Sequence, residues 1–224
     1  QYANNPAIQL HGPGWSKILI GDDCIEHWRD YLDVMVASIS DNGGRSCINA
    51  STVVVPKYGR EIAEAIATKV AEVFPRGPKD PDAILSGFAN PRMAEMMDAA
   101  IDAGLQTAGA VDCSADKHDG PRKVEQDGCT YLHPTILFCS SWDHPMAGKE
   151  YMFPFAQVIE TPQSEMLEKM GQSLIVTAIT NDDAFLQEIM ACPHIDRLNV
   201  GVLPTIHVEW NQPHEGNLFE FLYR

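Results

Sequence analysis

Cys47 is the residue of this chain whose type and setting best suit covalent chemistry. It ends the segment Asp41-Asn42-Gly43-Gly44-Arg45-Ser46-Cys47 and precedes the apolar run Val53-Val54-Val55. A cysteine on a turn between a helix and a strand can expose its sulfur to a cleft, and glycines let the backbone approach a substrate and turn its N–H groups inward. The pattern therefore predicts a nucleophilic thiol at Cys47. The alternative is a small buried apolar cysteine, which is common in soluble proteins.

Hydrophobic periodicity predicts the elements that position this turn. The helix before it carries apolar residues near the 3.6-residue period at Ile25, Trp28, Leu32, Met35, Val36 and Ile39. A strand at 52–55 follows it and is stopped by Pro56. Further helices are expected at about 59–74, 91–103, 164–170 and 183–190, and further strands at 17–20, 123–124, 131–132, 135–139, 155–160, 173–179 and 199–202. Strands that alternate with helices indicate an α/β fold with a mainly parallel sheet flanked by helices.

Composition narrows the class of protein. The 224 residues carry a formal net charge of −15, which argues against a nucleic-acid surface and against binding to anionic lipid. No apolar run approaches the roughly 20 residues that span a bilayer. The six cysteines are scattered without a Cys-x-x-Cys pair, so we expect reduced thiols in a cytoplasmic protein. Met93, Met96, Met97 and Ile101 are expected to pack in the core rather than to bind a ligand.

Several segments together resemble the aldehyde dehydrogenases. Asn42, Gly44 and Cys47 match the Asn-x-Gly-x-x-Cys pattern of that family's nucleophile loop, and Gln9-Leu10-His11-Gly12 stands in the place of its Glu-Leu-Gly-Gly segment. Glu150-Tyr151-Met152-Phe153-Pro154 is similar to its Glu-x-Phe-Gly-Pro motif. Weaker matches at 128–135, 173–182, 198–201 and 213–216 follow in the family order. The resemblance covers essentially the whole chain and implies the catalytic domain of such an enzyme.

The resemblance also implies a chemistry. Cys47 would attack an aldehyde carbon to form a thiohemiacetal, hydride would leave to NAD or NADP, and a second nucleophile would resolve the thioester. Glu150 would hold the nicotinamide ribose, and Asn42 would brace the nucleophile loop. Phe153 would pack against the nicotinamide, although a core phenylalanine is an equal alternative. Arg45 could lower the pKa of the thiol if it faces the sulfur, or it is a solvated surface arginine.

One departure from the family pattern bears on the reaction. The glutamate of Glu-Leu-Gly-Gly is the family's general base, and Gln9 stands there in this chain. A neutral amide cannot take a proton from water. We therefore keep two alternatives open. One is a CoA-acylating or acyl-reducing relative, in which water is not the acyl acceptor. The other is a non-catalytic fragment that contributes oligomer contacts.

The expected organisation follows from the same comparison. The chain begins at Gln1 rather than Met, both ends look cut, and we expect part of a longer polypeptide. Residues 1–20 would be the end of a cofactor-binding domain, 21–203 the catalytic domain and 204–224 a loop-rich C-terminal segment. The partners would be a small-molecule aldehyde and, in the full-length protein, one or three further copies in a homodimer or homotetramer. No metal site is expected, because no helical His-Glu-x-x-His pair occurs.

Overall fold

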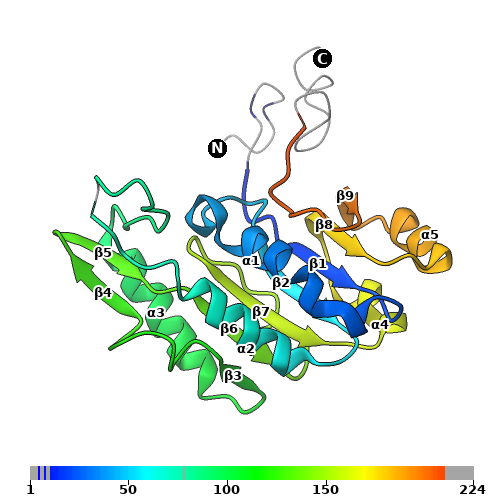
Figure 1. The fold of residues 1–224 in the computed structure, drawn as a ribbon, viewed down its shortest axis with the longest axis horizontal. Helices are drawn as coiled ribbons and strands as arrows, with labels where there is room; N and C mark the ends of the chain where they lie inside the picture. Colours follow the sequence, from blue (N-terminus) through cyan, green and yellow to red (C-terminus); the bar gives the residue numbers. More distant parts are fainter. Residues whose placement is uncertain (1–4, 6–7, 9–10, 78, 210–224) are drawn as a thin grey trace.

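The computed structural model describes residues 5, 8, 11–77 and 79–209, and its centre is a seven-stranded sheet (Figure 1). The strand order is β3-β6-β7-β2-β1-β8-β9. The strands are β1 (Ser16–Ile20), β2 (Ala50–Val55), β3 (Ala110–Asp112), β6 (Thr135–Cys139), β7 (Phe155–Glu160), β8 (Ser173–Ile179) and β9 (Ile195–Val200). Only the edge strand β3 runs antiparallel to its neighbour in this sheet. The predicted α/β fold with a mainly parallel sheet is therefore confirmed.

Helices cover both faces of the sheet. The helices are α1 (Leu32–Ser40), α2 (Gly59–Val70), α3 (Pro91–Leu105), α4 (Gln163–Lys169) and α5 (Asp183–Ala191), and β4 (Lys123–Gln126) and β5 (Cys129–Leu132) form a separate hairpin. Side chains alternate across a strand, so Ala156 and Val158 of β7 pack in one cluster with α1 and α2, whereas Phe155 and Ile159 pack with α3 on the other face. Helices α4 and α5 add a third cluster around Leu19 of β1.

The helix predicted before the Cys47 turn is an α-helix only in its second half. Ile25–Tyr31 forms a 3₁₀ helix, η1, with a non-helical backbone at His27, and the α-helix begins at Leu32. Ile25 and Trp28 are nevertheless buried, because a three-residue spacing also places side chains on one face of a 3₁₀ turn.

The methionines of α3 correct a second expectation. Ile101 is fully buried and Met97 is partly buried, but Met93 is 46% exposed and Met96 is 72% exposed. The buried stripe of α3 runs through Ala94, Met97 and Ile101. At about 100° per residue, Met96 points away from that stripe. The prediction that all four residues pack in the core is wrong for Met93 and Met96.

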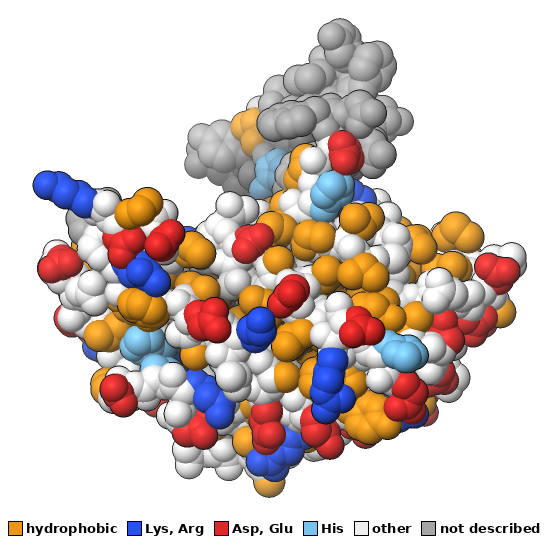
Figure 2. All heavy atoms as spheres, viewed as in Figure 1, with side chains coloured by type: hydrophobic (Ala, Val, Ile, Leu, Met, Phe, Trp, Pro, Cys, Tyr) orange, Lys and Arg blue, Asp and Glu red, His pale blue; other side chains and the backbone are white. Residues whose placement is uncertain are grey.

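The face that carries α1 and α2 has a mixed surface. Figure 2 shows basic side chains scattered singly among acidic and apolar ones over this face. No helix in the described part of the chain is long and apolar enough to cross a membrane.

Strand β1 is an interior strand of the sheet, paired with β2 on one side and β8 on the other. The sheet therefore begins at Ser16, before the domain boundary that the sequence suggested at residue 20. Residues 16–20 share a core with the rest of the chain, because Ile18 and Ile20 pack against α1 and α2. The assignment of the preceding residues to a cofactor-binding domain stays a prediction, as does that of the segment from 204 onward.

Candidate functional site

Cys47 lies on a tight turn at the edge of the sheet where the parallel strands begin. The 3₁₀ helix η2 (Asp41–Gly44) precedes it, and the Asn49 N–H donates to the Ser46 carbonyl 2.9 Å away, so the turn closes one residue before β2. The cysteine is half-buried. Its position between a helix and a strand is as predicted. The starts of β1, β7 and β8 lie at the same edge, because those strands run parallel to β2 and to one another.

The Cys47 turn is braced by the side chain of Asn49. Its Oδ1 accepts the Ser46 N–H at 2.9 Å, and its Nδ2 donates to the carbonyls of Ser38 at 2.9 Å and Asp41 at 3.0 Å. Asn42, to which the sequence assigned this role, is exposed in the left-handed conformation with φ 56°, which asparagine tolerates better than most residues. Sequence reasoning missed Asn49, although a buried amide directly before an apolar strand needs hydrogen-bond partners.

Two glycines let other segments contact this turn closely. A Cβ atom on Gly14 would lie 1.9 Å from the carbonyl oxygen of Cys47. One on Gly44, whose φ is +64°, would lie 2.4 Å from the backbone nitrogen of Pro154. The Ser16 hydroxyl also donates to the Cys47 carbonyl at 2.9 Å. Cys47 is therefore held between the start of β1 and the chain that leads into β7.

Replacing Gly14 by alanine should disturb this contact. The new methyl group would overlap a backbone oxygen that cannot move by a simple rotation, so we expect a loss of about 1–3 kcal/mol in the free energy of unfolding. The matched control is Gly12→Ala, because a Cβ there meets no atom of the described residues within 4 Å. Its effect should stay within about 0.5 kcal/mol. Urea unfolding of the three proteins measures the difference. Equal midpoints for both variants would contradict the close contact.

Glu150 lies at the same place as the Cys47 turn. Its two carboxylate oxygens accept the backbone N–H groups of Gly14 at 3.1 Å and of Trp15 at 2.5 Å. Burial raises the pKa of Glu150, while these two N–H groups and the charge of Lys17 oppose that rise. Trp15 itself has a left-handed backbone with φ 46°, which is unusual for a bulky residue. The carboxylate thus fixes a strained backbone directly before β1.

Phe153 has no exposed face for a cofactor in this structure. It is 1% exposed, and its ring packs against those of Phe88, Tyr151 and Phe155 at centroid distances of 5.7–6.5 Å. This burial fits the core alternative, and the contact with a nicotinamide stays a prediction. The backbone carbonyl carbon of Phe153 lies against Gly44, so this ring anchors the chain that supports the Cys47 turn.

The guanidinium of Arg45 contacts the segment 86–88, whereas the sequence suggested either a position facing the Cys47 sulfur or a solvated position on the surface. Its guanidinium donates to the carbonyls of Ser86 at 3.2 Å and Gly87 at 3.0 Å, and it stacks over the Phe88 ring at 4.7 Å. Burial lowers the pKa of Arg45. The side chain ties the loop before Cys47 to the segment 86–88.

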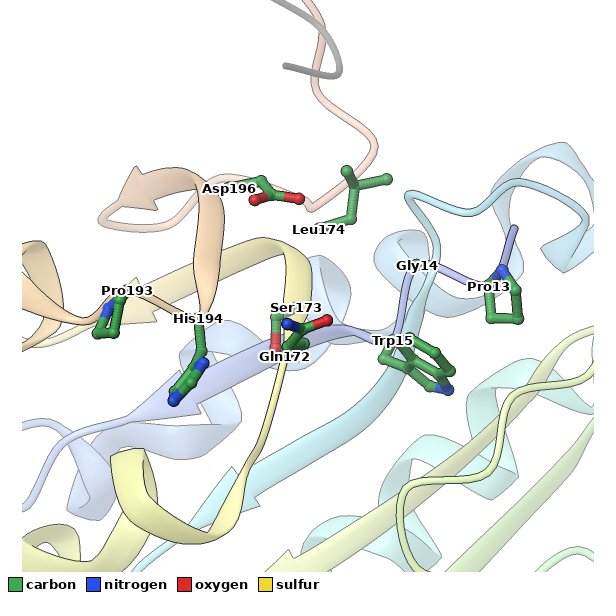
Figure 3. A pocket seen from close by; sticks show the side chains of 9 residues that line it. All are labelled: Pro13, Gly14, Trp15, Gln172, Ser173, Leu174, Pro193, His194 and Asp196. Atoms are coloured by element: carbon green, nitrogen blue, oxygen red, sulfur yellow. The ribbon is translucent and has the colours of Figure 1, made fainter. Parts of the chain in front are cut away.

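A small polar cavity lies beside the start of β1. Its volume is about 140 Å³, and Figure 3 shows that its walls come from the beginnings of β1, β8 and β9. The lining residues are Pro13, Gly14, Trp15, Gln172, Ser173, Leu174, Pro193, His194 and Asp196. Gly14 belongs both to this wall and to the contact with Cys47. Gln9, the residue at the expected base position, lies outside the described residues. Among the residues that the structure describes, no three His, Cys, Asp or Glu side chains gather closely enough to hold a metal ion.

Comparison with known proteins identifies the family to which this fold and sequence are similar. The sequence profile of the aldehyde dehydrogenase family matches residues 2–173. A search of curated protein sequences found no match. Among solved structures, gamma-glutamyl-gamma-aminobutyraldehyde dehydrogenase from Burkholderia cenocepacia is similar with a TM-score of 0.74 at 18% identity, over 91% of this chain and 40% of that one.

Two further structures show the same fold with a bound cofactor. Glyceraldehyde-3-phosphate dehydrogenase from Methanocaldococcus jannaschii, complexed with NADP, has a TM-score of 0.71 at 17% identity, over 93% of this chain and 43% of that one. The NAD⁺ complex of aldehyde dehydrogenase from Bacillus cereus has a TM-score of 0.73 at 16% identity, over 91% and 40%. The chain thus spans about two fifths of the length of these structures. Since the family profile covers more than half of the residues and the fold agrees, the chain belongs to the aldehyde dehydrogenase family.

Proposed function

We propose that the full-length protein oxidises a small aldehyde with NAD or NADP, and that Cys47 is its nucleophile. The observation that carries this proposal is the setting of Cys47. It lies half-buried on a turn at the edge where strands β1, β2, β7 and β8 begin, and separate segments hold its carbonyl from one side and its loop from the other. A thiol fixed in this way keeps its orientation while a substrate approaches.

The chemistry proposed for Cys47 is nucleophilic. Its thiolate attacks the aldehyde carbon and forms a C–S bond, giving a thiohemiacetal whose oxyanion the Cys47 backbone N–H would stabilise. One such donor is typically worth about 3–4 kcal/mol. Loss of hydride from that carbon then leaves a thioester on the sulfur, and a second nucleophile releases the acyl group and the thiol.

NAD or NADP would supply the hydride acceptor, and Glu150 is the residue of this chain proposed to contact it. Each oxygen of its carboxylate accepts one backbone N–H, and a carboxylate has about four lone-pair sites in all. Acceptors thus remain for the ribose hydroxyls. Solved relatives bind NADP in one case and NAD⁺ in another, so we propose a nicotinamide dinucleotide without choosing between them.

A second candidate function is transfer of the acyl group to a thiol such as CoA. The observation that favours it is Gln9, since glutamine in the expected base position cannot deprotonate water. A non-catalytic oligomerisation fragment is the third possibility. Assays of the full-length protein with aldehyde and NAD(P), with and without CoA, separate the three.

Selective alkylation tests the assignment of Cys47. If solvent exposure alone set the rate of alkylation, Cys129 would react first, because it is the exposed cysteine among the six. Burial raises the pKa of the thiols of Cys24, Cys113 and Cys139, to about 11 for Cys113 and about 12 for Cys139. If the site activates Cys47, dilute iodoacetamide should modify it before Cys129 and before half-buried Cys192. Peptide mapping that finds Cys129 labelled first, with Cys47 inert, would count against the proposal.

The remaining parts of the proposal concern the setting of the protein. None of the six cysteines, all of which the structure describes, is paired in a disulfide, which suits the proposed cytoplasmic location. Assembly of the full-length protein as a homodimer or homotetramer also remains a proposal, and its mass in solution tests it.

A further inference from the structure

Lys17 is a buried lysine in β1, an interior strand of the sheet. The residue is 1% exposed, and its Nζ donates to three acceptors: the carbonyls of Trp15 at 2.6 Å and Gln172 at 3.0 Å, and the Ser173 hydroxyl at 2.8 Å. A lysine ammonium has three N–H groups, so all of them are used. The side chain therefore serves the protein itself and has no donor left for a ligand.

The Lys17 ammonium and the Glu150 carboxylate hold the same two residues. Glu150 accepts the N–H groups of Gly14 and Trp15, whereas Lys17 donates to the Trp15 carbonyl. The Gly14 carbonyl accepts the N–H of Leu174 at 2.8 Å. Both N–H groups and both carbonyls of residues 14–15 are thus occupied, which holds Trp15 in its left-handed conformation.

These residues lie directly against the turn that carries the nucleophile. Gly14 contacts the Cys47 carbonyl, and Ser16 donates a hydrogen bond to it. We propose that Lys17 and Glu150 are positioning residues, which hold residues 14–16 against the Cys47 turn and so set the place of its sulfur. This inference rests on the proposed function, because it takes Cys47 as the reactive thiol.

The positioning role of Lys17 can be measured because its hydrogen bonds depend on whether its amine is protonated. Burial lowers the pKa of Lys17 to about 8, with the charge of Glu150 acting in the opposite direction. A neutral amine has only two N–H groups, so one of the three acceptors loses its donor above that pH. Glu150 is the charged group that acts on Lys17, and the titratable side chains of His194 and Asp196 line the adjacent cavity from exposed positions at the start of β9.

Stability and positioning should respond to this deprotonation in opposite directions. The pKa of Lys17 falls from an ordinary value of 10.5 to about 8, so between these values the unfolded chain holds more protons than the folded one. The contribution of Lys17 to the free energy of unfolding therefore rises with pH across that window. A loss of Cys47 reactivity in the same window cannot then come from a Lys17-driven unfolding.

The experiment measures alkylation of Cys47 in the full-length protein, with Cys129→Ser introduced to remove the exposed competitor. Peptide mapping gives the rate constant for the reaction of Cys47 with iodoacetamide at a series of pH values on both sides of the Lys17 pKa of about 8. With Lys17 present, the rate should rise as the thiolate forms and then fall as Lys17 loses its proton. In Lys17→Met, the rate constant for alkylation of Cys47 should be about tenfold lower than in the parent below pH 8. It should rise with pH and show no later fall, because the sulfur of Cys47 is displaced at every pH. The matched control is Lys69→Met, an exposed lysine of α2, which should behave as its parent.

Two further measurements keep the inference testable if Lys17→Met does not fold. Lys17→Arg keeps a charge at all relevant pH values and should remove the fall in rate. A ¹³C titration of the lysine Cε signals in the parent protein should find one lysine with its midpoint near 8 that coincides with the fall. A fall without such a midpoint, or the same profile with and without Lys17, would overturn the positioning role while leaving Cys47 as the nucleophile. A map that shows no label on Cys47 at any pH would instead refute the proposed function, and this inference with it.

Discussion

Replacing Cys47 by alanine in the full-length protein should abolish aldehyde-dependent reduction of NAD(P). Without the sulfur neither the thiohemiacetal nor the thioester can form, and removal of a catalytic nucleophile or its partners typically lowers kcat by roughly 10⁴–10⁶-fold. The fold should persist, because it is the backbone carbonyl of Cys47 that accepts the Ser16 hydrogen bond. Absorbance of the reduced cofactor at saturating aldehyde gives the rate.

The control for this variant is Cys129→Ser, which removes an exposed thiol of the separate β4–β5 hairpin. It should retain the activity of the parent protein. An unchanged melting temperature for Cys47→Ala would show that the loss is chemical. If Cys47→Ala kept substantial activity while Cys129→Ser lost it, the nucleophile would have been assigned to the wrong cysteine.

Replacing Gln9 by glutamate should speed hydrolysis of the acyl-enzyme. Glutamine can orient a water molecule but cannot accept its proton, whereas a glutamate in the same place can. General base catalysis contributes about 10²–10⁴-fold, so the thioester should decay faster by a factor of that order. The parent protein should accumulate the acyl-enzyme or pass the acyl group to a thiol. Rapid-quench measurement of acyl-enzyme decay, with and without CoA, records both outcomes.

The control is Gln172→Glu, which adds the same charge at an exposed position beside the start of β8. It should leave the decay rate near that of the parent, so that a general electrostatic effect is separated from base catalysis. Fast decay in the unaltered protein, or no change on Gln9→Glu, would mean that another group acts as base.

The order and type of the main elements could be predicted from the sequence, because each depends on contacts close along the chain. Strands β6, β7 and β8 begin and end at the expected residues, since apolar runs bounded by prolines and polar turns leave little choice. The turn at Cys47 was found for the same reason, because its glycines and the apolar strand after it are its sequence neighbours. The spacing of apolar residues could not predict the type of helix in η1. Ile25 and Trp28 are three residues apart, and this spacing suits a 3₁₀ helix as well as an α-helix.

Only the tertiary structure decided how the site is held together. Glu150 binds Gly14 across 136 residues of sequence, and Lys17 binds Ser173 across 156. Such contacts exist because the parallel pairing of β7 with β2, of β2 with β1 and of β1 with β8 brings the starts of distant strands to one edge. Pairing of β7 with β2 likewise brings the buried Phe153 against Gly44 of the loop before Cys47. The sequence by itself determined which residue could be the nucleophile and which fold carries it. The residues that hold the Cys47 turn were decided by packing, because side chains far apart in the chain become neighbours only when the strands pair.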